Sequence, residues 1–176
     1  GRVLATLDSL NLAEETIVVF YSDNGGHGSF QDLGQEENGI TDNSPLKAGK
    51  GSFYEGGIRV PMIVRWPEVT EAGTQTDEPV TSIDFYPTLL AAAGIDRPQD
   101  YLLDGVNMMP VLRDPSASLD REALFWHFPG YPNNPWRTTP VSVIRSGDWK
   151  LMKFYQFDRL ELYNLEKDTE EAENLA

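Results

Sequence analysis

The clearest hydrophobic pattern in the chain is an apolar run at residues 16–21 that ends in a polar, glycine-rich turn. The run is β-branched and aromatic, is too short for a helix, and is followed directly by a Ser-Asp-Asn-Gly-Gly sequence at 22–26. This pattern predicts a strand buried on both faces, as in the interior of a parallel sheet. Because ligands of open α/β sheets collect just beyond the carboxyl ends of such strands, we expect a functional loop at Asp23 and Asn24.

Asp23 and Asn24 have the chemistry of metal ligands. A carboxylate and an amide carbonyl are oxygen donors that suit a hard cation such as calcium or magnesium. Gly25 and Gly26 would let the backbone turn sharply beside a ligand. The same residues are also an ordinary turn signal, since asparagine and glycine tolerate positive φ. The pattern alone therefore leaves a metal-binding loop and a simple turn both open.

Helical and strand patterns on either side of this loop indicate an α/β region. Apolar residues at helical spacing predict a helix over residues 2–11. A second strand is expected within 58–66, with pairing that starts after Pro61. A further helix is expected to begin near Asp84, which can cap it, and to end at Gly94. One helical turn is expected between Met108 and Leu112.

From about residue 116 the pattern changes to short strands separated by polar turns, which is typical of an antiparallel meander. We therefore divide the chain into residues 1–115, part of an α/β domain, and residues 116–176, a small antiparallel β subdomain. Residues 164–171 are predicted to start a terminal helix. The four predicted strands are 123–128, 141–145, 150–155 and 160–165.

A long polar loop over residues 28–52 separates the first two strands, and loops of this length are usually functional or disordered. Lys50 lies in this loop between two glycines, where a flexible backbone would let the ammonium group approach a bound anion. The alternative is a solvated loop lysine. Lys47 is the competing cation, and we expect it to be exposed.

The composition narrows the classes of partner. The net charge of -14 argues against non-specific nucleic-acid binding and against docking on anionic membranes. The chain has no cysteine, which excludes a thiolate metal site and a cysteine nucleophile within it. No apolar run approaches the length needed to span a bilayer. A local basic pocket could still bind an anion, because net charge describes the whole surface.

Several motifs, in this order, resemble the C-terminal portion of the formylglycine-dependent sulfatases of the alkaline-phosphatase-like superfamily. The resemblance implies a mixed sheet flanked by helices, followed by a small antiparallel β subdomain. The motifs that carry it are Ser22-Asp-Asn-Gly-Gly, Pro45-Leu-Lys-Ala-Gly-Lys-Gly, Glu55-Gly-Gly-Ile-Arg-Val-Pro, Ser82-Ile-Asp-Phe-Tyr-Pro-Thr-Leu-Leu, Arg145-Ser-Gly-Asp-Trp-Lys and Glu161-Leu-Tyr-Asn-Leu.

The resemblance implies that Asp23 and Asn24 ligate a calcium ion and that Lys50 contacts the substrate sulfate and assists the leaving oxygen. In this family a hydrated formylglycine, made from a cysteine or serine near the N-terminus, attacks the sulfur. The metal polarises the sulfate oxygens, and the lysine and the cation together stabilise charge on the bridging oxygen. The implied substrate is a sulfated carbohydrate or an aryl sulfate, and the implied location is periplasmic or secreted.

One departure from the family pattern is decisive for what this chain can do. The nucleophile motif, Cys or Ser followed by x-Pro-x-Arg, is absent, and so are counterparts of the N-terminal metal-binding aspartates. We therefore expect a C-terminal fragment that is inactive alone, with the formylglycine nucleophile upstream. A strand that has lost its neighbours would also promote self-association of this fragment.

The two histidines are the remaining candidates for substrate binding. His27 follows the metal loop and would either face the substrate cleft or lie solvated in the loop. His127 would either contact a sugar, together with the aromatic loop at 129–136, or be a half-buried, hydrogen-bonded ring. Three charged residues are expected to be structural: Glu55, Arg59 and Arg145.

Two other functions remain open at this point. One is a phosphoesterase or phosphonate hydrolase of the same superfamily, against which Lys50 and the run from Glu55 to Pro61 favour a sulfatase. The other is a non-catalytic carbohydrate-binding module, which would account for the missing nucleophile and for the aromatic residues between Trp126 and Trp136.

Overall fold

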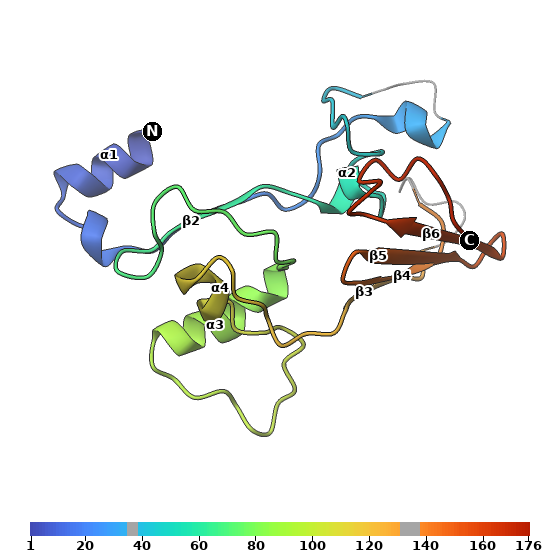
Figure 1. Cartoon of the computed structure of the whole chain (residues 1–176). Helices are drawn as coiled ribbons and strands as arrows, with labels where there is room; N and C mark the ends of the chain where they lie inside the picture. The colour runs from blue at the N-terminus through green and yellow to red at the C-terminus, as the bar shows by residue number, and fades with distance from the viewer. Residues whose placement is uncertain (35–38, 131–137) are drawn as a thin grey trace. The chain divides into compact units, whose positions relative to one another are not determined.

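The chain forms two compact units in the computed structural model, which describes residues 1–34, 39–130 and 138–176 (Figure 1). The first unit comprises residues 1–20 and 63–121, and the second comprises residues 21–62 and 122–176. The division into domains 1–115 and 116–176 stays a prediction for the whole protein. Within this chain, residues 21–62 pack with the C-terminal residues, and the candidate site residues all belong to this second unit.

The first unit contains most of the helices. The helix α1 (Arg2–Ser9) confirms the predicted N-terminal helix, and the 3₁₀ helix η1 (Ala13–Glu15) follows it. The helix α3 (Phe85–Ala92) begins after η3 (Ser82–Asp84) and ends before Gly94, whose φ of +66° provides the left-handed cap. No helix among the described residues is long and apolar enough to cross a membrane.

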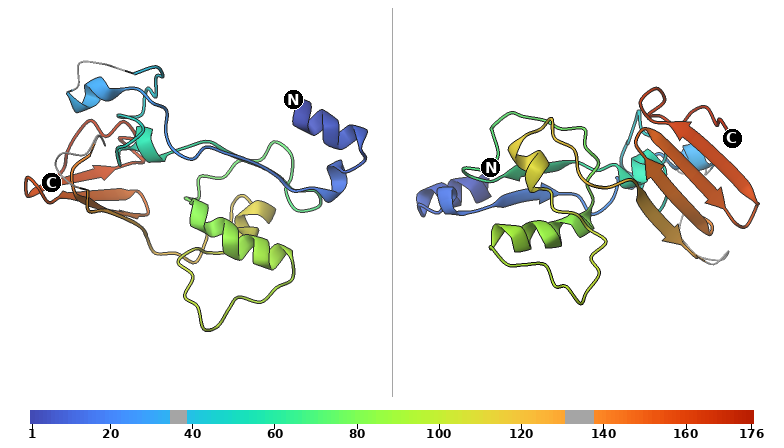
Figure 2. Two further views of the ribbon diagram at one scale, coloured as in Figure 1. Left: turned by 180° about the vertical axis from the view of Figure 1, so that it is seen from behind. Right: turned by 60° about the horizontal axis from the view of Figure 1, so that its bottom comes forward.

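The short helix α4 (Met109–Arg113) confirms the predicted helical turn and lies beside α3 (Figure 2). The Met108 amide donates to Thr88 Oγ1 at 2.8 Å. Asp84 is fully buried at the start of α3, where it accepts a hydrogen bond from the Thr81 amide and pairs with the Arg121 guanidinium at 2.8 Å. The capping role expected for Asp84 is therefore joined by an ion pair that orders this end of the unit.

The first strand, β1 (Val18–Tyr21), pairs with β2 (Met62–Arg65) in a two-stranded sheet. Pairing starts after Pro61, as predicted. The prediction that this strand is buried on both faces is wrong for the chain, because Val19 is 41% exposed and Phe20 is 60% exposed. Among the described residues β1 has β2 as its one paired neighbour, so its outward faces are left uncovered.

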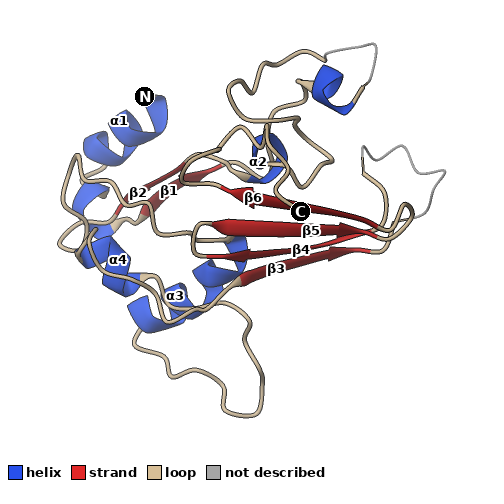
Figure 3. Cartoon of the chain, turned by 45° about the vertical axis from the view of Figure 1, so that its right-hand side comes forward, coloured by secondary structure: helices blue, strands red, loops and turns tan. Residues whose placement is uncertain are grey.

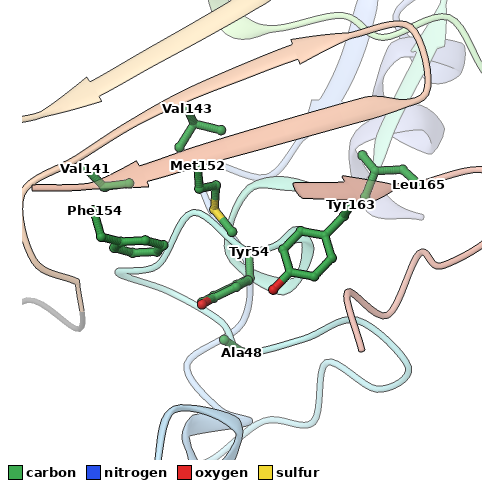
Figure 4. Close-up of a cluster of buried hydrophobic side chains, with 8 residues drawn as sticks. All are labelled: Ala48, Tyr54, Val141, Val143, Met152, Phe154, Tyr163 and Leu165. Carbon is green, nitrogen blue, oxygen red and sulfur yellow. The ribbon is translucent and has the colours of Figure 1, made fainter. Parts of the chain in front are cut away.

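The second unit is built on an antiparallel sheet of four strands in the order β3-β4-β5-β6 (Figure 3), which confirms the predicted meander. Inward side chains from these strands form the core with Ala48 and Tyr54, which come from the long loop (Figure 4). The strands are β3 (Leu124–Phe128), β4 (Val141–Ser146), β5 (Trp149–Phe154) and β6 (Arg159–Asn164). The inward core residues are Val141, Val143, Met152, Phe154, Tyr163 and, after β6, Leu165.

A buried charge cluster lies beside this core. Lys150 shares the inward face of β5 with Met152 and Phe154 and is fully buried. Its ammonium lies 2.9 Å from Glu55 Oε1 and 2.7 Å from Glu171 Oε1. The Glu55 amide donates to Glu171 Oε2 at 2.6 Å. Because a buried charge is costly unless it is paired, these contacts fix the three side chains relative to one another.

The predicted terminal helix is wrong, and the charge cluster gives the reason. Asp168 accepts the amides of Ala172 and Glu173, four and five residues on, whereas a helix cap would accept an amide two or three residues on. Glu171 has a left-handed φ of +53°, which ends any helical path and directs its carboxylate to Lys150. Residues 165–176 therefore form turns without a helix.

A second polar group ties the long loop to the sheet. The hydroxyls of Tyr54 and Tyr163, whose rings lie near Met152 in Figure 4, both donate to Glu161 Oε2 at 2.8 Å. Burial raises the pKa of each tyrosine well above its usual value.

Lys47 lies over the Tyr54 ring at 4.5 Å and donates to the Glu171 carbonyl at 2.9 Å, so the prediction that it is exposed is wrong.

The three glycine-rich segments of the second unit interlock through their backbones. The Gly25 amide donates to the Gly57 carbonyl in α2 (Glu55–Ile58) at 2.8 Å, and the Lys50 amide donates to the Gly26 carbonyl at 2.9 Å. A Cβ atom on Gly25 would lie 1.7 Å from the Gly56 carbonyl oxygen. A Cβ on Gly49 would lie 2.4 Å from two carbonyl oxygens. The segments can approach this closely because glycine has no side chain.

Replacing Gly49 with alanine should disrupt this interlock. The new methyl group would clash with the carbonyl oxygens of Gly26 and Gly28, so we expect the free energy of unfolding to fall by about 2 to 3 kcal/mol. Gly73→Ala is the matched control, because its surroundings are open and only its φ of +81° should cost about 1 kcal/mol. Urea unfolding measures both variants, and equal losses would contradict the interlock.

The buried carboxylate of Glu171 should make stability depend on pH. Burial raises its pKa above the usual 4.5, although the Lys150 ammonium acts in the opposite direction. The folded chain therefore holds this proton more tightly than the unfolded chain, and the stabilisation is present below pH 4.5 and is lost as the pH rises through the folded pKa. Glu171→Gln should flatten this fall when the free energy of unfolding is measured upward from pH 4.5. An unchanged slope would contradict the assignment.

Candidate functional site

The loop after β1 and the loop that carries Lys50 form one connected backbone structure. The Lys50 amide donates to the Gly26 carbonyl at 2.9 Å. The Asn43 side chain lies between the two loops and donates to the carbonyls of Gly26 and Ala48, each at 3.0 Å. The residues from 43 to 50 are thus held directly against the segment that follows Asp23 and Asn24, although the sequence separates them widely.

Asp23 and Asn24 lie at the end of β1, as predicted. Asp23 is exposed, and its Oδ1 accepts the Asn24 amide at 3.1 Å. The side-chain Nδ2 of Asn24 donates to the Gly25 carbonyl at 2.9 Å, an arrangement that turns its Oδ1 away from Gly25. The Ser22 hydroxyl donates to the Asn24 carbonyl at 2.9 Å and closes the turn. The loop therefore presents a carboxylate and an amide oxygen from a fixed backbone.

These two residues fit part of a site for a hard cation. Their oxygen atoms are the donors that calcium and magnesium take. In the described parts of the chain, however, no group of three or more His, Cys, Asp or Glu residues could hold a metal ion. Since calcium takes six or more oxygens, Asp23 and Asn24 can supply only a minority of a complete ligand set.

Lys50 has an exposed side chain on a fixed backbone. Its side chain is exposed, while its backbone is fixed between buried Gly49 and Gly51, which has a φ of +89°. Within residues 1–34, 39–130 and 138–176, no carboxylate lies within 4 Å of its ammonium group. Lys150, by contrast, is paired with two carboxylates. Lys50 is thus a charge on a rigid base that remains available to a ligand.

His27 lies in the same loop as Asp23 and Asn24. Its ring is exposed and meets the buried Phe30 ring edge to face, with the ring centres 4.9 Å apart. Phe30 begins the 3₁₀ helix η2 (Phe30–Leu33) within the long loop. The His27 carbonyl accepts the Ile40 amide at 2.9 Å. His27 therefore lies in the connected backbone formed by the loop after β1 and the long loop, and its contact with substrate stays a prediction.

His127 lies on a different surface. It is on the outward face of β3, since its neighbours Trp126 and Phe128 pack against the core. Its Nδ1 lies 2.8 Å from Ser142 Oγ across the β3–β4 pair. It lines a groove of about 480 Å³ together with Phe125 and Lys153. The face that holds this groove is opposite to the one that packs on Ala48 and Tyr54, and most of the predicted aromatic loop at 129–136 lies outside the described residues.

The charge cluster around Lys150 was not recognised from the sequence. Glu55 was expected to be structural, and its ion pair with Lys150 and its 3.7 Å contact with Arg59 agree with that expectation. The available signal was the alternation along β5, where Lys150 shares a face with Met152 and Phe154. A lysine at a core position requires a buried carboxylate partner.

The family matches cover the whole chain. Residues 1–95 match the sulfatase family, and residues 49–176 match the family described as N-sulphoglucosamine sulphohydrolase, C-terminal. A sulfatase from Formosa agariphila is 43% identical over 99% of this chain. The human steryl-sulfatase is 41% identical over 76% of it. The chain spans 32% and 23%, respectively, of the length of these two relatives.

The fold of the chain matches those of solved structures. A solved structure of a protein in complex with its substrate, D-glucosamine-2-N,6-O-disulfate, matches 99% of this chain with a TM-score of 0.78 and 29% identity, and the chain covers 33% of that protein. The predicted alkaline-phosphatase-like class, an α/β part followed by a small antiparallel sheet, is thereby confirmed. Its two family matches and its relatives show that the chain belongs to the sulfatase family, of which it represents the C-terminal portion.

Proposed function

We propose that this chain is the C-terminal part of an enzyme that hydrolyses sulfate esters of a sulfated carbohydrate. The observation that carries the proposal is the 2.9 Å hydrogen bond from the Lys50 amide to the Gly26 carbonyl. This hydrogen bond joins the loop that carries Lys50 to the loop that carries Asp23 and Asn24. An esterified sulfate is an anion, and a cationic side chain beside oxygen ligands for a cation can bind it.

Each site residue has one task in this proposal. Asp23 and Asn24 would hold a calcium ion together with oxygens from the rest of the protein, and such an ion would supply Lewis acidity toward the sulfate oxygens. Lys50 contacts the sulfate and stabilises the bridging oxygen as the S–O bond breaks. Water supplies the oxygen that ends on the sulfate and the proton that ends on the leaving alcohol. The interlocked glycines hold the backbone of Lys50 and the backbone of the Asp23–Asn24 loop in fixed positions relative to each other during this step.

The chain cannot complete the reaction without other parts of the protein. Its sequence has no nucleophile motif, and Asp23 and Asn24 are too few ligands for tight calcium binding. We therefore propose that the isolated chain binds calcium weakly and does not turn over a sulfate ester. The formylglycine nucleophile and the remaining ligands belong to the larger protein, which we place in the periplasm or outside the cell.

The substrate class rests on the nature of the relatives. The structural relative bound to D-glucosamine-2-N,6-O-disulfate favours a sulfated sugar, whereas the similarity to steryl-sulfatase keeps a small, apolar sulfate ester as the second candidate. His27 is the nearer of the two histidines to the ligand loop in sequence and backbone contacts, so we assign it to substrate binding before His127. A phosphoester would also suit a cation beside Lys50 and is the competing reaction.

Lys50→Ala in the larger protein should remove most of the activity. Loss of one positioned charge at the leaving oxygen should lower kcat by about 100- to 1,000-fold for a sulfate ester. Lys167→Ala is the control, because Lys167 is an exposed lysine in the turns after β6. The measurement is steady-state hydrolysis of an aryl sulfate, an aryl phosphate and a sulfated disaccharide.

Three results would contradict the proposed function. Lys50→Ala could retain full activity, the aryl phosphate could be hydrolysed faster than the sulfates, or the isolated 176-residue chain could turn over a sulfate ester without its partner residues. The proposal expects none of them. Binding of a sulfated sugar by the larger protein without any hydrolysis would instead support a carbohydrate-binding module.

A further inference from the structure

We propose that Lys150, in the small β sheet, is a positioning residue that sets the Lys50 loop and the Asp23–Asn24 loop through Glu55. This inference rests on the proposed function for its effect on activity, but its structural part can be tested separately. Among the described residues, Lys150 contacts Glu55 and Glu171 and makes no ion pair with either loop. Its influence passes through an ion pair to the helix α2, and from α2 to both loops.

The first link of this path is the buried ion pair. Lys150 Nζ lies 2.9 Å from Glu55 Oε1, and Glu55 is the first residue of α2. Both side chains are almost completely buried, at 0% and 1% exposure. In such surroundings water cannot replace a lost partner, so the position of α2 is coupled to the position of β5.

The second link connects α2 with the ligand loop. The Gly57 carbonyl in α2 accepts the Gly25 amide at 2.8 Å, directly after Asn24. A Cβ on Gly25 would lie 1.7 Å from the Gly56 carbonyl oxygen, so these backbones are in direct contact. A small displacement of α2 must therefore move the backbone that presents Asp23 and Asn24.

The third link connects α2 with Lys50. The Gly56 amide donates to the Lys47 carbonyl at 2.9 Å, and the Ser52 amide donates to the Gly49 carbonyl at 3.1 Å. A Cβ on Gly57 would lie 2.3 Å from the Ser52 carbonyl oxygen. The segment from 47 to 57 is thus tightly connected by its own backbone contacts. Its helical end, α2, carries Glu55, the residue that pairs with Lys150.

The charges explain why an apolar side chain at position 150 could not take the place of Lys150. Glu171 Oε2 accepts the Glu55 amide at 2.6 Å, and Glu171 Oε1 contacts Lys150 at 2.7 Å. Without the ammonium group, two carboxylates would share one buried space, and the cations beside them in the described residues would be the half-exposed Arg59, 3.7 Å from Glu55 Oε2, and Lys47, which donates to the Glu171 carbonyl. One of the two carboxylates would then have to take up a proton or draw in water, and either change removes the attraction that holds α2 against β5.

The structural test is amide hydrogen exchange on the 176-residue chain. Lys150→Met removes the charge at similar volume. Glu55→Gln is the second variant, because it removes the charge that attracts α2 to Lys150, while Lys150 keeps Glu171 as a partner and the sheet keeps its core. Exchange of the Gly25 and Lys50 amides should accelerate about tenfold or more in both variants, while the β4–β5 amides of Glu55→Gln stay within about twofold of the unchanged chain. Lys167→Met, an exposed lysine, should leave all of these rates unchanged.

The functional test uses the larger protein and reports kcat per folded enzyme. Lys150→Met and Glu55→Gln should each lower kcat by about 10- to 100-fold, with KM within about threefold, because they misplace groups that act in the reaction. Slow amide exchange at Gly25 and Lys50 in Glu55→Gln, or a full kcat per folded enzyme, would overturn the inference. If Lys50→Ala is harmless but the exchange rates rise, the proposed function fails and the positioning path stands.

Discussion

The buried ammonium group of Lys150 holds together three segments of the second unit that lie far apart in the sequence. It sits at a core position of β5 and has two carboxylate neighbours, one from α2 and one from the turns after β6. A solvent-exposed ion pair contributes little to stability, but a buried charge that loses its partner is costly. The sequence elements that carry Glu55, Lys150 and Glu171 therefore have to fold together.

This constraint connects the small sheet with the loops that carry Asp23, Asn24 and Lys50. The cluster fixes α2, α2 contacts the loop after β1, and both contact the segment that carries Lys50. The backbone of the site is thus buried and closely packed, whereas the side chains of Asp23 and Lys50 are exposed. Such a division suits a binding site, because the exposed groups can meet a ligand without reorganising the loops beneath them.

The strands of the small sheet could be predicted from the sequence because each alternates inward and outward residues and is separated from the next by turn residues. The loops that carry Asp23, Asn24 and Lys50 could be located from local sequence, since glycine and polar residues mark such loops, and the roles of these residues stay predictions. The burial of β1 could not, because it depends on neighbouring strands that the described residues do not provide. The terminal helix failed for a similar reason, since Lys150 draws Glu171 out of helical geometry through a contact far away in sequence.

The most direct measurement is a crystal structure of the larger protein with calcium and a sulfate ester bound without turnover. The account predicts that oxygens of Asp23 and Asn24 ligate the ion and that the Lys50 ammonium contacts the bridging oxygen of the ester. It also predicts that the Gly25–Gly57 and Lys50–Gly26 backbone hydrogen bonds are retained. A calcium ion held by other residues, with the Lys50 ammonium in solvent and away from the sulfate, would contradict it.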